Sequence, residues 1–150
     1  MMEPSAEVDR LAREAVDAAY GIHRSIGPGL LESAYETVLA EHLRRRGFIV
    51  DRQVPIDINI DGLLVADAFR ADLLLENKLL IELKSVERLA PVHHKQVLTD
   101  IRLMNLPLGL LINFGAELFR DGAKRIINNR ALGAFAPWRG NPPPSSETQE

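Results

Sequence analysis

The sequence contains no cysteine, which excludes a disulfide framework, a zinc–thiolate cluster and a cysteine nucleophile. No apolar run approaches the ~18 residues that a membrane-spanning helix needs. Residues 1–5 lack the basic and apolar regions of a signal peptide. Basic residues are not in excess, because the net charge is −3 and the pI is about 5.8; tight, non-specific coating of nucleic acid is therefore not expected. Together these absences favour a cytoplasmic protein with no membrane contact.

The sequence has the length and composition of one ordinary globular domain. It has 150 residues, of which 46% are hydrophobic and 26% charged, enough to bury a real core. Near the end, three consecutive prolines are followed by polar residues, a composition typical of disordered segments. We therefore expect a single domain over residues 1–139 and a disordered tail over residues 140–150.

The pattern of apolar residues predicts helices first and strands afterwards. Helical spacing predicts a helix from an N-cap at Ser5 to about residue 25 and a second over residues 30–46, separated by Gly27-Pro28-Gly29. Strand patterns follow: one starts at residues 48–50 and alternates over residues 54–60, and others are predicted at residues 63–66, 69–75 and 79–84, with a turn at Asp61-Gly62. A third helix is predicted from Pro91 to about residue 105.

A buried strand is predicted at residues 108–114, and residues 123–128 form either an edge strand or a short helix, with a strand favoured. The resulting order is ααββββαβ with room for one more strand. It predicts an α+β fold in which a central mixed β-sheet is flanked by helices.

Two strongly apolar segments carry charges that need an explanation. Residues 69–75 contain Asp72, and residues 79–84 contain Glu82 and Lys84. Strands this apolar are normally buried, and a buried charge is costly unless it is paired or bound to a metal. Because side chains alternate along a strand, Glu82 and Lys84 point to the same face.

The length of the intervening loop decides whether Asp72 joins them. If Asn77-Lys78 is a two-residue turn, Asp72 lies opposite Leu83 and faces away from Glu82. If the loop is Glu76-Asn77-Lys78, Asp72 pairs directly with Glu82, with Cβ atoms roughly 4.5–5.5 Å apart. Two carboxylates at that distance repel each other, and a hard divalent cation removes the repulsion. The ordinary alternative is a surface ion pair between Glu82 and Lys84, worth ~0–1 kcal/mol.

If the carboxylates meet, the chemistry they indicate is metal-assisted hydrolysis. Carboxylate oxygens suit Mg²⁺ or Mn²⁺ rather than zinc. Such an ion polarises a phosphodiester and lowers the pKa of bound water, and Lys84 would orient that water or stabilise charge in the transition state. Both acids must be ionised to bind the ion, so activity should fall at low pH.

A further set of motifs makes the sequence recognisable. Residues 29–35, Gly-Leu-Leu-Glu-Ser-Ala-Tyr, fit the signature G-x-x-E-x-x-Y. Other motifs follow in order: Arg52-Gln53-Val54-Pro55-Ile56, Phe69-Arg70-Ala71-Asp72, Ile81-Glu82-Leu83-Lys84-Ser85, Pro91-Val92-His93 and Leu108-Gly109-Leu110-Leu111-Ile112-Asn113-Phe114-Gly115. From about residue 8 to 130 the sequence resembles the GxxExxY proteins, a family of the PD-(D/E)XK nuclease-like superfamily.

The resemblance implies a restriction-endonuclease-like core, α-β-β-β-α-β, and assigns roles to particular residues. The implied metal ligands are Asp72, Glu82, the backbone carbonyl of Leu83 and Glu32. The implied catalytic residues are Glu32, Asp72, Glu82 and Lys84, and the implied substrate-positioning residues are Gln96, His93 and Arg70. The related pattern Q-x-x-x-Y has a tyrosine where this sequence has Asp100.

Two residues near Glu32 receive structural interpretations. Tyr35 is expected to be a packing residue, and Glu36 is expected to be an ordinary helix acid that faces solvent.

Two functional hypotheses follow. The first is a nuclease dependent on Mg²⁺ or Mn²⁺ that acts on DNA, with RNA less favoured. The second is a non-catalytic module of the same fold that binds nucleic acid or another protein, either as a monomer or as a homodimer. The complete set of two acids and a lysine favours the first, while the acidic pI and Asp100 argue for the second.

Overall fold

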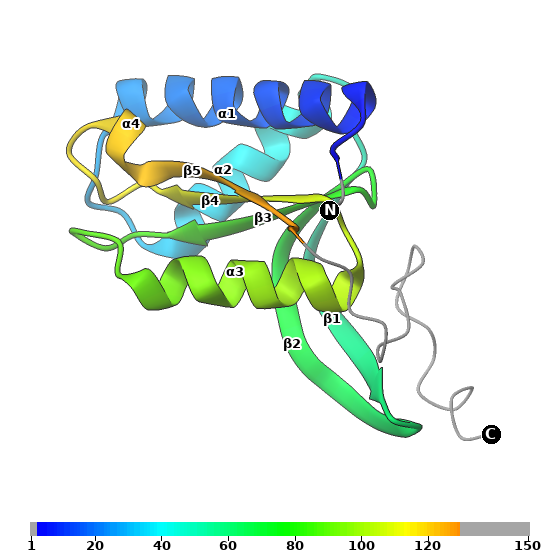
Figure 1. Cartoon of the computed structure of the whole chain (residues 1–150). Coiled ribbons are helices and arrows are strands. Elements are labelled where there is room, and N and C mark those ends of the chain that lie inside the picture. The colour runs from blue at the N-terminus through cyan, green and yellow to red at the C-terminus, as the bar shows by residue number, and fades with distance from the viewer. Residues whose placement is uncertain (1–2, 130–150) are drawn as a thin grey trace.

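A computed structural model describes residues 3–129 of the chain (Figure 1). Its elements, in chain order, are α1 (Ala6–Ile26), α2 (Glu32–Arg45), β1 (Val50–Ile60), β2 (Leu63–Leu75), β3 (Leu79–Lys84), α3 (Pro91–Met104), β4 (Leu108–Asn113), α4 (Phe119–Gly122) and β5 (Ala123–Ile127). The predicted domain end at residue 139 and the predicted tail over residues 140–150 lie outside the described residues. None of the described helices has the length and apolar character needed to cross a membrane.

The helices begin and end close to where the sequence predicts. α1 starts after Ser5, whose hydroxyl accepts a hydrogen bond from the backbone N–H of Val8 at 3.2 Å, as an N-cap residue does. It ends at Gly27, which has a φ of 75°, a backbone conformation that glycine adopts without steric cost. α3 occupies the predicted range and ends at Asn105, which takes the left-handed conformation common at helix ends.

α2 starts two residues later than predicted, because a short connection precedes it and is held in place by Tyr35. The hydroxyl of Tyr35 donates to the carbonyl of Gly27 at 2.5 Å and accepts from the N–H of Leu30 at 3.2 Å. Its fully buried ring stacks on Phe114 with centroids 4.5 Å apart. The packing role predicted for Tyr35 is confirmed, and it fixes the point at which Glu32 enters α2.

The strands form one mixed sheet, as predicted, in the order β1-β2-β3-β4-β5. β3 and β4 are parallel, and the other neighbouring pairs are antiparallel. Three strands rather than the predicted four precede α3, because residues 63–66 and 69–75 belong to one continuous strand, β2. Residues 123–127 form an edge strand, which confirms the favoured interpretation, and the short helix α4 before it was not expected.

Helices cover both faces of the sheet, so the molecule has two apolar cores (Figure 1). α1 and α2 pack on one face over side chains that include Leu73, Ile81 and Ile112. α3 packs on the other face over side chains that include Leu74, Leu80 and Leu111. The resulting architecture is the α+β fold that the sequence predicts, with a mixed sheet between helical layers.

The β1–β2 hairpin contributes to both cores, because its side-chain alternation reverses part-way along. Val50 belongs to the core under α1 and α2, whereas Val54 belongs to the core under α3. Residues four apart in a regular strand point to the same face, so the alternation must reverse between them. The reversal occurs at Gln53, which has a φ of 50° and lies between the pairs Arg52↔Leu73 and Val54↔Ala71.

Beyond this reversal the hairpin extends past α3 as an arm, residues 57–68, which ends at the predicted turn (Figure 1). Asp61 and Gly62 have φ values of 52° and 82°. Two successive residues with positive φ match the tight hairpin turn that Asp-Gly favours. The predicted turn is therefore confirmed.

Candidate active site

Asp72 and Glu82 meet where β2 and β3 separate. Regular pairing of the two strands stops at Leu73↔Ile81. Beyond that pair, side chains replace the backbone ladder: the N–H of Leu83 donates to Asp72 Oδ2 at 2.9 Å, and the N–H of Asp72 lies 3.4 Å from Glu82 Oε1. Each carboxyl group thus bonds to the backbone of the other's strand, and the charge of Asp72 acts on Glu82. The three-residue loop over residues 76–78, with Leu75 paired to Leu79, is the odd-length loop that this meeting requires.

The surroundings of Glu82 favour its protonated form. Burial raises its pKa from 4.5 to about 9, and the charge of Asp72, the hydrogen bond to Asp72 and the charge of Asp100 act in the same direction. Without a cation, a pKa of about 9 keeps Glu82 protonated at neutral pH. A divalent cation between the two carboxylates would take the place of that proton.

A pocket of about 210 Å³ lies between this end of the sheet and α3. Its lining residues are Phe69, Glu82, Lys84, His93, Gln96, Val97 and Asp100. The structure thus brings the predicted positioning residues Gln96 and His93 to the same pocket as Glu82 and Lys84. Arg70, the third predicted positioning residue, is exposed on β2, and its neighbour Phe69 lines the pocket instead.

Asp100 adds a further carboxyl group to the pocket. Burial raises its pKa to about 7, and the negative charge of Asp72 contributes to the shift. In the sequence, Asp100 appears only as a departure from the Q-x-x-x-Y pattern. Its position one helical turn after Gln96 is the signal that places both side chains on one face of α3.

The start of α3 fixes the tautomer of His93. The N–H of Ala90 donates to His93 Nδ1 at 3.0 Å, and the N–H of His93 donates to the carbonyl of Ala90 at 3.0 Å. Since Nδ1 acts as an acceptor, the proton of the neutral ring is on Nε2. His93 can therefore offer one N–H donor from the pocket wall.

Glu32 lies beside the pocket rather than among its lining residues. It is the first residue of α2 and lines a neighbouring hollow of about 620 Å³, together with Leu31, Ser33, Glu36, Arg52 and Gln53. Burial raises its pKa, the charge of Asp72 adds to the rise, and Lys84 opposes it. Glu32 is thus within electrostatic range of Asp72 and Lys84, and it faces the hollow on the α2 side.

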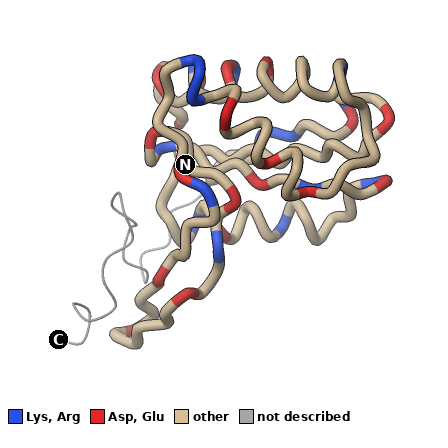
Figure 2. Tube along the Cα trace, turned by 180° about the vertical axis from the view of Figure 1, so that it is seen from behind, with Lys and Arg blue, Asp and Glu red and all other residues tan. Residues whose placement is uncertain are grey.

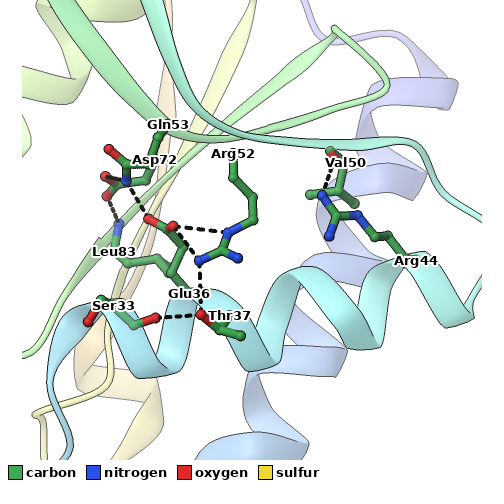
Figure 3. A network of polar contacts seen from close by, with 9 residues as sticks. All are labelled: Ser33, Glu36, Thr37, Arg44, Val50, Arg52, Gln53, Asp72 and Leu83. Atoms are coloured by element: carbon green, nitrogen blue, oxygen red, sulfur yellow. Dashed lines mark hydrogen bonds and ion pairs between the residues drawn. The ribbon is translucent and has the colours of Figure 1, made fainter.

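Glu36 is not the solvent-facing acid that the sequence suggests. It is 5% exposed, and Arg52 donates to its Oε2 from Nε at 3.1 Å and from Nη2 at 3.0 Å. Gln53 Nε2 donates to Glu36 Oε1 at 2.6 Å and lies 3.2 Å from Asp72 Oδ1 (Figure 3). The expectation was wrong because Arg52 and Gln53 of β1 cover the Glu36 carboxylate, and Arg52 balances its charge. The signal available in the sequence was that Glu36 lies one helical turn after Glu32 and therefore on the same face of α2.

One known protein family matches most of the chain. The model of the PD-(D/E)XK nuclease superfamily matches residues 9–126. The chain belongs to the PD-(D/E)XK nuclease superfamily. No curated protein and no solved structure matched the chain.

The superfamily assignment agrees with the order of elements. From α2 to β4 the chain reads α-β-β-β-α-β, the core that the resemblance implies. Glu82-Leu83-Lys84 has the form (D/E)-x-K, and Asp72 follows Ala71 where the name of the PD-(D/E)XK superfamily has proline. Glu32 also lies within the matched range.

PD-(D/E)XK nucleases generally use divalent metal ions, and the oxygen atoms of a carboxyl pair are suitable ligands for such ions. Among residues 3–129, no three acidic or histidine side chains come together as a ready-made cage for an ion, so Glu32 does not complete one here. Mg²⁺ commonly binds through one or two carboxylates and keeps several waters. Asp72 and Glu82, which meet between β2 and β3, fit that mode of binding.

Proposed function

We propose that the protein is a nuclease that hydrolyses phosphodiester bonds with the help of Mg²⁺ or Mn²⁺, and that its substrate is DNA in preference to RNA. The observation that carries the proposal is the meeting of Asp72 and Glu82, each of whose carboxyl groups reaches the backbone of the other's strand, with Lys84 two residues beyond Glu82 on β3. Membership of the PD-(D/E)XK nuclease superfamily supports it. We also place the chain in the GxxExxY family, because Tyr35 of that signature holds the connection before Glu32.

In this proposal, the two carboxylates, together with the backbone carbonyl of Leu83, hold the ion. The ion supplies a Lewis acid at a phosphate oxygen. The ammonium group of Lys84, on the pocket wall beside Glu82, stabilises negative charge on the phosphate in the transition state. Glu32 supports the metal ion or the attacking water from the α2 side.

The pocket wall on α3 offers donors that would position the substrate. His93 presents the N–H of Nε2, and Gln96 presents its side-chain amide. Both are suited to phosphate oxygens. Arg70, exposed on β2, would contact a phosphate farther along the strand of nucleic acid.

The second candidate, a non-catalytic binding or interaction module, is favoured by one observation. Asp100 lines the pocket where a related pattern has tyrosine, and a carboxyl group repels phosphate unless it is protonated or offset by a cation.

A cleavage assay separates the two candidates. Wild type, Glu82→Gln and Lys84→Ala are incubated with single- and double-stranded DNA and with RNA, in Mg²⁺, Mn²⁺ or EDTA. Glu41→Gln is the control, since Glu41 is an exposed acid of α2 that pairs with Arg45. We expect cleavage by wild type and Glu41→Gln in the metal ions alone and a loss of at least about 100-fold in the other two variants.

Two outcomes would contradict the proposal. Equal cleavage by all four proteins would identify a contaminating nuclease. Binding of nucleic acid by wild type without any cleavage in either metal ion would support the non-catalytic module instead.

A further inference from the structure

Gln53 connects the candidate metal site to a buried ion pair. Its side-chain nitrogen is 2.6 Å from Glu36 Oε1 and 3.2 Å from Asp72 Oδ1 (Figure 3). A glutamine amide has two N–H groups, so it can donate to both carboxylates at once. The orientation of the amide is determined by this chemistry, because its oxygen would be repelled by both neighbours.

The backbone of Gln53 is unusual at the point where this contact is made. Its φ of 50° is in the left-handed region, which a residue with a side chain seldom adopts inside a strand. The same residue reverses the alternation of β1 and lies opposite Asp72, between the pairs Arg52↔Leu73 and Val54↔Ala71. This local geometry brings the amide to the space between α2 and Asp72.

Asp72 is consequently held at both of its oxygens. Gln53 approaches Oδ1, and the N–H of Leu83 donates to Oδ2 at 2.9 Å. Two donors on different oxygens fix the plane of a carboxylate, and each oxygen keeps a further lone pair for an ion. Leu83 alone would leave the carboxylate free to rotate about its own bond.

Glu36 supplies the rigidity that Gln53 lacks. Gln53 is exposed, and an exposed glutamine loses considerable rotamer freedom when it is ordered. Glu36 is buried, and Arg52 fixes its Oε2 through two nitrogen atoms. Its Oε1 is therefore presented to the Gln53 amide in a fixed position.

We propose that Gln53 is a positioning residue that orients the Asp72 carboxylate for metal binding, and that Glu36 holds the Gln53 amide in place. The inference rests on the proposed function, since it assigns Asp72 to the metal site. Residues that orient metal ligands in this way commonly change metal affinity by 10–100-fold when they are removed.

The test measures Mn²⁺ affinity by calorimetry, with thermal unfolding of each variant recorded alongside. Gln53→Leu keeps the bulk of the side chain and removes both donors; we expect it to weaken Mn²⁺ binding about tenfold. Glu36→Gln should weaken binding in the wild-type background and have no further effect in the Gln53→Leu background, because Glu36 acts through Gln53. A merely structural role would lower the melting temperature and leave the affinity unchanged.

Thr37→Val is the matched control. Thr37 Oγ1 accepts from Arg52 Nη2 at 2.9 Å, so the variant disturbs the same network without touching the link to Asp72; Mn²⁺ affinity should stay at the wild-type value. If Gln53→Leu does not fold, Gln53→Ala and the Glu36→Gln variant give the same comparison.

The outcomes separate this inference from the proposed function. If wild type binds Mn²⁺, Glu82→Gln does not, and Gln53→Leu binds as wild type does, the inference fails while the proposed function stands. Additive effects of the Glu36 and Gln53 changes would also overturn it. If wild type itself binds no Mn²⁺, both proposals fail.

Discussion

At the scale of single residues, the proton on Glu82 governs the behaviour of the site. The folded protein keeps this carboxyl group neutral up to a pKa of about 9, mainly because it is buried. Above its own pKa of about 7, Asp100 adds a negative charge that raises the pKa of Glu82 further. Metal binding has to displace the Glu82 proton, so the metal affinity of the folded protein should rise with pH.

The raised pKa of Glu82 predicts how stability depends on pH in the absence of metal. In the unfolded chain Glu82 ionises near 4.5, whereas in the folded protein it ionises near 9. Its contribution to stability is therefore complete below pH 4.5 and is lost as pH rises through 9. We expect the free energy of unfolding in EDTA, measured by urea denaturation, to decline between pH 5 and 9.

Glu82→Gln is the variant that checks this pH dependence. It should flatten most of the decline, and the remaining slope below about pH 7 should come from Asp100. Stability that rises over this interval, or a slope unchanged in Glu82→Gln, would show that Glu82 ionises normally.

Some of these residues could be predicted from the sequence, and others could not. The sequence singled out Asp72, Glu82 and Lys84 because charges in apolar strands demand a reason. It left open whether Asp72 and Glu82 meet, because that depends on the length of the loop between β2 and β3. The burial of Glu36 depends on Arg52, which is 16 residues away, and helical periodicity carries no such information. The role of Gln53 could not be predicted. Glycine is the usual sequence signal for a left-handed backbone conformation, and this position has a glutamine instead.

At the scale of elements, Asn113 joins the ends of two parallel strands next to the site. It is 1% exposed and lies at the end of β4, where its Cα partner is Lys84. Its Oδ1 accepts from the N–H groups of Val86 and Gly115 at 3.0 Å, and its Nδ2 donates to the carbonyl of Val86 at 2.8 Å. Any Cβ atom on Gly115 would overlap the Val86 backbone, so the two chain segments approach closely.

Asn113→Ala should therefore destabilise the protein and reduce its activity. The change leaves two N–H groups and a carbonyl without partners, and each unsatisfied buried group costs about 1–3 kcal/mol. We expect the free energy of unfolding, measured by urea denaturation, to fall by at least about 2 kcal/mol. Cleavage should also slow, because the backbone that follows Lys84 loses its hydrogen bonds to β4. Asn59→Ala is the comparison: Asn59 makes one exposed bond, to Gly62 N–H at 3.0 Å, and its loss should cost about 1 kcal/mol or less.

β2 also shows why a local sequence pattern can misjudge where a strand ends. The sequence divides β2 at residues 67–68, where polar and small residues interrupt the alternation. In the structure the strand continues, because Asp67 takes a φ of 49° and its N–H donates to Asp57 Oδ1 at 2.8 Å. A polar interruption marks either an end or an irregularity within a strand, and only the partner strand decides between them.

At the scale of the whole molecule, charge gives little help in binding a polyanion. The net charge is −3, and in the view of Figure 2 positive and negative residues are interspersed along the trace rather than gathered on separate sides. Attraction to nucleic acid must therefore come from a few local contacts and from the bound cation.

This distribution of charge predicts that DNA binding depends on a divalent ion. Fluorescence anisotropy should show weak binding in EDTA and stronger binding in Ca²⁺, which uses the same kind of oxygen ligands. The affinity should fall only shallowly with added salt, since few phosphates are neutralised by Lys or Arg. Equally tight binding in EDTA, or a steep salt dependence, would point to a basic surface that the described residues do not form.

The fold as a whole was predictable because its helices and buried strands follow simple periodicities, and the resemblance supplied their arrangement. That the β1–β2 hairpin contributes to both apolar cores could not be predicted, because it depends on the reversal of side-chain alternation at Gln53.

The arm has a consequence for how such a protein can change. Its tip, Asp61-Gly62, lies at the far end of the two strands that also carry Gln53 and Asp72. Residues inserted at this turn would lengthen the hairpin that leads to the candidate site, while the order of the sheet would stay intact. A longer hairpin could thereby add a contact surface for the substrate without changing the residues of the candidate site.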